Sequence, residues 1–260
     1  VMVPGMGTIA GSVMGTYIGM LGGTDPAAKV LFATHLLSAS VMAVPGSIVL
    51  AKMLCPQTEE ATDHVAISGK EKENSNILDA ISSGTVTGVK LMTNIAAMLL
   101  VFISLVALAN YITEGVIGRY TGLNDWIVKI TDGKAQGLTF QFILGVITSP
   151  FMWLIGVPSQ DIMLVGSLLG QKTILKEFVA YFQLQQWKDA GLFMYEKSIL
   201  MSTYILCGFA NISSIGILLG GLGVLAPEKR GLISRIGVPA MIGGALVSVL
   251  SATIIGMILG

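Results

Sequence analysis

Charge is scarce in this sequence, and so is cysteine. Asp, Glu, Lys and Arg together make up 12% of the 260 residues, whereas soluble domains contain about 25%. Because 53% of the residues are hydrophobic, a soluble globule of this size would lack the polar surface to cover itself. The fifteen basic and fifteen acidic residues cancel, so the chain lacks the basic field that binds nucleic acid. These absences exclude a soluble globular domain, argue against a nucleic-acid partner and leave an integral membrane protein.

Motifs for covalent or metal chemistry are also missing. The two cysteines, Cys55 and Cys207, lie in or at the end of apolar runs, with no C-x-x-C pair. We interpret both as thiols that fill a core. The two histidines, His35 and His64, lie in different settings, and no Ser-His-Asp pattern or phosphate-binding glycine loop occurs. The sequence therefore predicts neither an enzyme nor a resident cofactor.

Long runs without charge dominate the chain. Six of them reach 22 residues or more, and about 20 suffice for a helix to cross a bilayer. They cover residues 1–24, 30–51, 91–113, 135–160, 198–227 and 236–260. Helices satisfy their own backbone in lipid, and the alternation typical of barrel strands is missing. We expect an all-α, polytopic protein that crosses the cell's inner or plasma membrane several times.

The start of the sequence is unusual. Val1 already lies inside an apolar run, without an initiator Met or a basic flank. Such a start is typical neither of a signal peptide nor of a natural N-terminus. We expect the chain to be a piece of a longer protein, of which another part contributes to function.

Polar connectors separate the apolar runs. The most polar one lies between Cys55 and Asn76. Asn76, with Asp79 three residues later, has the pattern of a helix N-terminus and predicts a short amphipathic helix at the membrane surface. Residues 114–134 predict a second connector, a loop with one short helix around Trp126.

Two of the apolar runs contain glycines and polar residues near their middle. They are residues 5–12, and residues 208–214, which include Asn211 and two serines. Such a composition favours an interrupted helix, and lipid tolerates an interruption only where it lines a cavity or a site. Alternatively, the small residues serve close packing between helices. The pattern alone supports both interpretations equally.

A third run, residues 135–160, is broken by the sequence Gly-Val-Pro at 156–158. A helix over 138–155 would span roughly 27 Å at about 1.5 Å per residue, which crosses only a thin bilayer core. A re-entrant helical hairpin with its tip at 156–158 fits the same pattern, and we favour it.

Glu177 is the most informative single residue. It lies in a predominantly apolar stretch, and a carboxylate at bilayer depth costs about 2.5 to 3.5 kcal/mol on insertion scales. One interpretation is a structural ion pair with Lys172 or Lys176. The other is a carboxylate that faces an aqueous cavity, where it accepts hydrogen bonds from a polar substrate or carries a proton.

Four blocks of sequence, in this order along the chain, carry a family resemblance. They read AGSVM at 10–14, SASVMAVP at 38–45, EFVAY at 177–181 and CGFANISSI at 207–215. With them, the chain resembles the concentrative nucleoside transporters over essentially its whole length, as the C-terminal part of their fold. The resemblance implies an elevator-type transporter with unwound transmembrane helices and a re-entrant helical hairpin, which assembles as a homotrimer.

On this resemblance the chain divides into five parts. Residues 1–54 hold the first unwound helix and the following span, 55–90 the polar connector and surface helix, 91–134 a scaffold helix and an external loop, 135–182 the second helical hairpin, and 183–260 the second unwound helix and the final span. The first part and the last two form the transport domain. The family's first hairpin, with its Gln-Thr-Glu tip, has no counterpart in these residues.

The resemblance also implies a substrate site. Glu177 corresponds to a carboxylate that binds ribose hydroxyls, and Asn211 and Ser214 to further ribose-binding positions. Phe209 corresponds to an aromatic wall beside the ligand, and Val13 to an apolar contact with the base. The implied substrate is a nucleoside such as uridine.

A coupling ion is implied as well. The Thr8 hydroxyl and the Ile9 backbone carbonyl correspond to ligands of a sodium ion that the first hairpin shares. We therefore expect secondary active transport of nucleosides, coupled to a sodium gradient or, alternatively, to a proton gradient. Two other functions remain open from the sequence: a membrane-embedded enzyme that uses Glu177 as an acid or base, and a passive channel through the same cavity.

Overall fold

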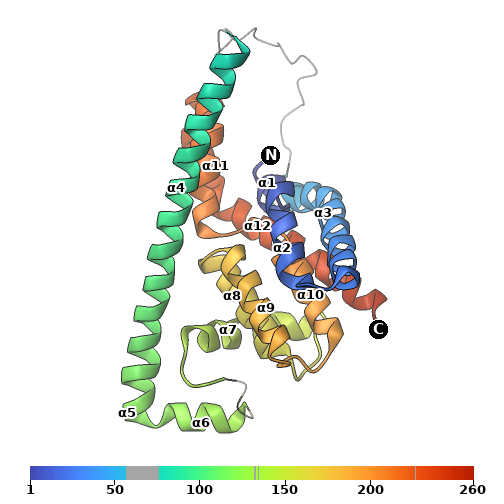
Figure 1. The fold of residues 1–260 in the computed structure, drawn as a ribbon, viewed down its shortest axis with the longest axis vertical. Helices are drawn as coiled ribbons and strands as arrows, with labels where there is room; N and C mark the ends of the chain where they lie inside the picture. Colours follow the sequence, from blue (N-terminus) through green and yellow to red (C-terminus); the bar gives the residue numbers. More distant parts are fainter. Residues whose placement is uncertain (57–75, 132, 134, 226) are drawn as a thin grey trace.

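The computed structural model describes residues 1–56, 76–131, 133, 135–225 and 227–260. Within these residues the regular secondary structure is helical (Figure 1). The prediction of an all-α chain is therefore confirmed for the part that is described, whereas most of the polar connector after Cys55 lies outside it.

The N-terminal part contains three helices. They are α1 (Met2–Gly7), α2 (Gly11–Gly22) and α3 (Pro26–Leu54). The tight turn before α3 ends at Asp25, whose side chain accepts hydrogen bonds from the backbone N–H groups of Ala27 and Ala28 at 3.0 and 3.3 Å. Together with Pro26 at the first helical position, this cap explains why α3 begins at this point.

A long helix follows the connector and stands along one side of the molecule (Figure 1). The segment comprises α4 (Ile77–Asn110), the π-helix η1 (Tyr111–Gly118), α5 (Arg119–Thr121) and α6 (Leu123–Ile130). Asn76 caps α4 as predicted, since its Oδ1 accepts a hydrogen bond from Asp79 N at 2.9 Å. The short helix around Trp126 is confirmed as α6.

The prediction of a short surface helix followed by a separate scaffold helix is wrong. The helix continues through residue 90 without interruption up to Asn110. No proline occurs between Ile77 and Asn110, and the charge near the expected boundary is a single lysine, Lys90. A change from amphipathic to apolar composition does not break the backbone by itself, because both compositions support helix formation.

The C-terminal half folds into shorter helices that end in one long helix. They are α7 (Phe140–Leu154), α8 (Ile162–Ile174), α9 (Glu177–Asp189), α10 (Glu196–Leu206), α11 (Ile212–Leu225), η2 (Pro227–Lys229) and α12 (Arg230–Ile258). In Figure 1, α8, α9 and α10 occupy the middle of the molecule, between α7 below and the α1–α3 group above.

α7 and α8 pack together as a helical hairpin, and its re-entrant insertion into the membrane stays a prediction. Its turn contains Gly156 with φ of 82°, a conformation that favours glycine. The two arms approach closely through glycines: a Cβ at Gly145 would lie 2.8 Å from the Met163 carbonyl oxygen, and one at Gly166 would lie 2.7 Å from Thr148 Oγ1. The sequence thus builds a tightly packed hairpin.

The six apolar runs do not all form continuous spanning helices. Within the described residues, α3 and α12 are the two helices long and apolar enough to cross a membrane. The apolar runs 1–24, 135–160 and 198–227 are each divided by a break or a turn. Their halves are too short to span a bilayer alone, since a span needs about 20 residues.

The hydrophobic core lies between the interrupted helices and the long helices α3 and α12. One cluster of buried apolar side chains joins α2, α3, α8, α9 and α10, and a second joins α1, α3 and α12. Cys207 is buried in the first cluster, which confirms its prediction, but Cys55 is exposed at the end of α3, so its prediction as a core thiol is wrong. The apolar run that ends at Cys55 leaves it at the helix terminus, beyond the packed part of α3.

Candidate substrate site at the helix breaks

Three breaks in the helices build the candidate site. In the first, Thr8 and Ala10 adopt extended conformations between α1 and α2. In the second, Leu175 (φ −93°, ψ −95°) and Lys176 separate α8 from α9. The third covers residues 207–211, between α10 and α11. For the first and third breaks, the glycines and polar residues allowed an interrupted helix or close packing equally, and the family resemblance implied unwound helices. The second break was not predicted.

Glu177 and Asn211 meet across two of these breaks. Glu177 is the first residue of α9, and its Oε2 accepts a hydrogen bond of 2.7 Å from Asn211 Nδ2. Glu177 is 4% exposed and Asn211 is fully buried. A buried carboxylate is tolerated when donors and a helix N-terminus compensate its charge, and the position of Glu177 provides both.

The orientation of the Asn211 side chain is determined by its other contacts. Its Oδ1 accepts hydrogen bonds from Ser213 Oγ at 2.7 Å, from Ser214 N at 2.9 Å and from Ser214 Oγ at 2.9 Å. The bond from the Ser214 backbone caps the start of α11. With three donors on its oxygen, the amide must point its nitrogen toward Glu177. Three of the predicted site residues, Glu177, Asn211 and Ser214, therefore form one connected group.

The ion pair considered for Glu177 does not form. Among the described residues, no lysine Nζ lies within 4.0 Å of its carboxylate. Lys172 instead donates hydrogen bonds from Nζ to the Ile205 carbonyl at 2.7 Å and to Ser248 Oγ at 2.9 Å. The interpretation of Glu177 as half of a structural salt bridge is thus wrong.

The first break lies directly against the third. A Cβ at Gly208 would lie 3.1 Å from the Gly7 carbonyl oxygen and 2.5 Å from Ser248 Oγ. Gly244 of α12 is just as close, because a Cβ there would lie 2.7 Å from Met6 Cβ and 3.2 Å from Ala210 Cβ. Glycine at both positions allows α1, α12 and the break before α11 to pack closely together. Gly244 was not among the residues predicted to take part in this contact.

The remaining predicted residues lie around this group. Thr8 is partly buried in the first break, and its Oγ1 donates a hydrogen bond of 2.9 Å to Pro4 O. Ile9 and Val13 are partly buried and pack against the first core cluster, and Phe209 is partly buried in the third break. Among the described residues, no side-chain hydrogen bond joins Thr8, Ile9 or Val13 to Glu177.

Stacked tyrosines connect the first half of the chain to α9. Tyr17 of α2 stacks on Tyr181 of α9 with ring centroids 4.0 Å apart, and Tyr181 donates a hydrogen bond of 2.9 Å to the Thr203 carbonyl. Both rings are fully buried. They fix α9 between α2 and α10, one helical turn beyond Glu177, and so hold the carboxylate in place.

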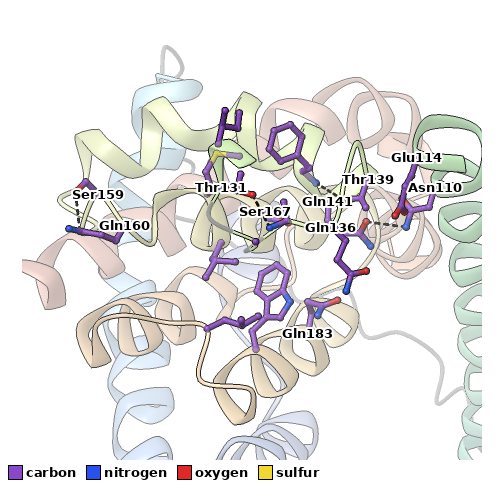
Figure 2. Close-up of a pocket in the computed structure, with 18 residues that line it drawn as sticks. Asn110, Glu114, Thr131, Gln136, Thr139, Gln141, Ser159, Gln160, Ser167 and Gln183 are labelled. Atoms are coloured by element: carbon purple, nitrogen blue, oxygen red, sulfur yellow. Dashed lines mark hydrogen bonds between the residues drawn. The ribbon is translucent and has the colours of Figure 1, made fainter. Parts of the chain in front are cut away.

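A large cavity lies apart from the group formed by Glu177, Asn211 and Ser214. It has a volume of about 620 Å³ and lies between the end of α4, the loop before α7, and helices α7 to α9 (Figure 2). Polar side chains line much of it, including Asn110, Glu114, Gln136, Gln141 and Gln183. Asn110 links the two sides, because its Nδ2 donates to Gln141 Oε1 at 3.2 Å and its Oδ1 accepts from Phe140 N at 2.7 Å. None of the predicted substrate or ion ligands lines this cavity.

Broken helices, a helical hairpin and a buried carboxylate at a break are together typical of membrane transporters whose substrate sites lie at interrupted helices. Residues 35–256 match the family described as "Na+ dependent nucleoside transporter C-terminus". The chain belongs to this family of multi-pass membrane transporters, as the sequence blocks predicted. It is therefore not an enzyme, and the alternative of a membrane-embedded enzyme is wrong.

Curated relatives from several organisms are similar along the whole chain. An uncharacterised transporter of Haemophilus influenzae is 38% identical over 263 residues, which cover 100% of this chain and 58% of the relative. Sodium/nucleoside cotransporter 1 of Rattus norvegicus is 37% identical and is covered to 39% of its length by 99% of this chain. The nucleoside permease NupC of Helicobacter pylori is 35% identical, with 100% of this chain and 57% of the permease covered.

Solved structures have a similar fold over almost the whole chain. CNTnw in an inward-facing, substrate-bound state superposes with a TM-score of 0.79 at 35% identity, over 98% of this chain and 55% of that one. A CNTnw variant in an outward-facing state gives a TM-score of 0.82 at 35% identity, over 99% and 57%. The chain thus spans roughly two fifths to three fifths of the proteins it matches.

Proposed function

We propose that this chain forms the C-terminal part of a sodium-coupled nucleoside transporter that works by an elevator mechanism in the inner or plasma membrane. The observation that carries the proposal is the hydrogen-bonded group of Glu177, Asn211 and Ser214 at the meeting point of helix breaks. The family membership supports the substrate class, and the chemistry of the site supports the roles of these residues.

A nucleoside is neutral overall, but its ribose hydroxyls must give up their water on entering the site. A carboxylate that accepts a hydrogen bond from such a hydroxyl contributes about 1.5 to 3 kcal/mol. Glu177 is held for this role by Asn211 and by the start of α9. In the proposal, Asn211 and Ser214 add polar contacts to the ribose, Phe209 covers one side of the ligand and Val13 contacts the base.

The coupling ion is proposed to be sodium, bound at the first break. A hard cation prefers oxygen ligands, and an unwound segment supplies carbonyls. Thr8 donates its hydroxyl hydrogen to Pro4 O, so the lone pairs of Oγ1 remain for a cation, and Ile9 lies in the non-helical stretch between α1 and α2. These residues fit a sodium ion, which would supply positive charge beside the substrate site, with further ligands from the first hairpin.

The elevator mechanism assigns a role to each region. In the proposal, α4 belongs to a fixed scaffold through which the protein trimerises. The elements that contain the breaks, together with the α7–α8 hairpin inserted from one side of the membrane, move across the bilayer as a unit. The position of α4 along one side, apart from the elements that contain the breaks, supports this division (Figure 1).

Uptake by proteoliposomes that contain the complete gene product tests the proposal. Labelled uridine should accumulate above its external concentration under an inward sodium gradient, and it should not accumulate under a proton gradient alone. Accumulation driven only by protons would assign the other coupling ion. Equilibration without accumulation under either gradient would indicate a passive channel and overturn the proposal.

A further inference from the structure

Lys172 of α8 is a fully buried lysine in an apolar helix. Burying an ammonium group without compensation is very costly, and lysine is almost never fully buried unless it is paired. In the part of the chain that the structure describes, Lys172 has no carboxylate within 4.0 Å. Its direct hydrogen-bond partners are neutral oxygen atoms, the Ile205 carbonyl at 2.7 Å and Ser248 Oγ at 2.9 Å, and the more distant Glu177 carboxylate adds an electrostatic attraction.

These oxygen atoms belong to the end of a broken helix. Ile205 lies in the last turn of α10, which ends at Leu206, and the last four carbonyls of a helix lack partners within it. Ser248 Oγ in turn donates a hydrogen bond of 3.1 Å to the Cys207 carbonyl. Lys172 and Ser248 therefore satisfy carbonyls on both sides of the point where α10 unwinds, and a positive charge there also interacts favourably with the C-terminal end of the helix dipole.

The ammonium group also lies where two breaks approach each other. A Cβ at Gly208 would lie 3.3 Å from Lys172 Nζ, 3.1 Å from the Gly7 carbonyl oxygen and 2.5 Å from Ser248 Oγ. Gly208 follows Cys207 in the non-helical stretch 207–211, which ends at Asn211. Lys172 thus contacts the start of the same segment whose end holds Asn211 against Glu177.

We propose that Lys172 is a positioning residue for the substrate site, and that its ammonium group acts as a built-in cation at the break between α10 and α11. An unwound helix leaves carbonyl oxygens that a cation can bind. At this break the chain supplies the cation from its own side chain, which holds residues 207–211 in the conformation that presents Asn211 to Glu177. The effect on substrate rests on the proposed function, but the effect on the segment does not.

Hydrogen–deuterium exchange of the complete protein tests the structural part without any substrate. Lys172→Met removes the charge and both hydrogen bonds at similar side-chain length, and Ser248→Ala removes the bridging hydroxyl. Lys188→Met is the matched control, because Lys188 also donates to a helix-end carbonyl, that of Leu21, but far from the break between α10 and α11. We expect faster exchange in residues 206–214 for Lys172→Met and Ser248→Ala but not for Lys188→Met.

Binding of uridine and of the deoxyuridine that lacks the hydroxyl contacted by Glu177, as identified by competition with 2′-, 3′- and 5′-deoxyuridine, tests the functional part. We expect the Kd of Lys172→Met for uridine to rise about 10- to 150-fold, the range for a charged hydrogen-bonded group, and that of Lys188→Met to stay within about twofold. Because the loss falls on the ribose contacts, the ratio of the two nucleoside affinities should approach one in Lys172→Met. A mere loss of folded protein would lower the number of binding sites and leave that ratio unchanged.

Unchanged exchange in residues 206–214 in folded Lys172→Met overturns the proposal, and so does an unchanged ratio of affinities. Should Lys172→Met fail to fold, the milder Ser248→Ala decides by the same two measurements. Should the wild type bind no nucleoside at all, the proposed function fails, and the exchange experiment still decides whether Lys172 holds the segment.

Discussion

Asn211 donates a hydrogen bond of 2.7 Å to Glu177 although 34 residues separate them in sequence. The contact joins the start of α9 to the stretch before α11, and both side chains are buried. An asparagine whose oxygen is saturated by three donors and whose nitrogen faces a carboxylate is fixed in one orientation.

Glu177→Gln should nearly abolish uridine binding. The substitution keeps the shape of the side chain but removes the negative charge, so a ribose hydroxyl no longer donates to an ionised acceptor. We expect an affinity loss of about 10- to 150-fold, measured by isothermal titration calorimetry on the complete protein. Retention of the protein in the membrane fraction is the control, and undiminished accumulation of uridine by this variant would remove Glu177 from the site.

Ribose hydroxyls should be recognised individually. We expect the deoxyriboside that lacks the hydroxyl contacted by Glu177 to bind about 10- to 150-fold more weakly than the riboside, because the same charged hydrogen bond is lost from the ligand side. Competition against labelled uridine with 2′-, 3′- and 5′-deoxyuridine measures this. In Glu177→Gln the difference should vanish, and equal affinity of all four compounds for the wild type would contradict the assigned contact.

Asn211→Asp should separate helix capping from substrate binding. An aspartate retains the oxygen that caps α11 at Ser214 N, so the melting temperature should change little. Its second oxygen, however, replaces the donor to Glu177 and brings two carboxylates together, which is unfavourable. We expect uridine binding to be lost at neutral pH in a folded protein, as measured by titration and thermal unfolding. Wild-type affinity in this variant would show that the amide donor is dispensable.

Thr8→Val should weaken sodium binding and leave the direct contacts with the ribose intact. Valine has nearly the shape of threonine but no oxygen, so the proposed site loses one ligand. We expect the sodium concentration for half-maximal uptake to rise about tenfold or more, corresponding to a loss of about 1.4 kcal/mol or more. Thr8→Ser keeps the hydroxyl and should behave like the wild type. An unchanged sodium dependence in Thr8→Val would place the ion elsewhere.

Gly208→Ala should destabilise the protein. The added methyl group would lie 2.5 Å from Ser248 Oγ and 3.1 Å from the Gly7 carbonyl, and overpacking of this kind costs about 1–3 kcal/mol. Gly216→Ala is the control, because a Cβ there meets nothing within 4 Å and alanine favours the helix. Thermal unfolding of both variants should give a lowered melting temperature for Gly208→Ala only.

The sequence was most informative where composition conflicts with a continuous apolar helix. Glycines, hydroxyls and Asn211 in the middle of apolar runs indicated an interruption or close packing, and breaks occur there at 8–10 and 207–211. The Gly-Val-Pro sequence predicted the turn between α7 and α8. The carboxylate of Glu177 in an apolar stretch indicated a compensating partner or a cavity, and Asn211 is the partner that the structure provides. In each case, a residue that is unfavourable in a continuous membrane helix indicated a local structure that offsets its free-energy cost.

Other features could not be predicted because they depend on tertiary contacts. The break at Leu175 and Lys176 has no proline and no glycine, and the position of α9 against α2 and α10, through Tyr17 and Tyr181, accounts for it better than local preference. Lys172 was considered only as a partner for Glu177, since nothing local indicates that a lysine will bind helix-end carbonyls 33 residues away.

Gly244 allows α12 to pack closely against two of the helix breaks. Helix α12 packs against Met6, beside the first break, and against Ala210, within the third break. It therefore holds these two breaks together. In the proposed transporter, these two breaks would not separate without loss of their packing against Gly244. We therefore expect the proposed substrate to leave on the other side of the site, near the break between α8 and α9.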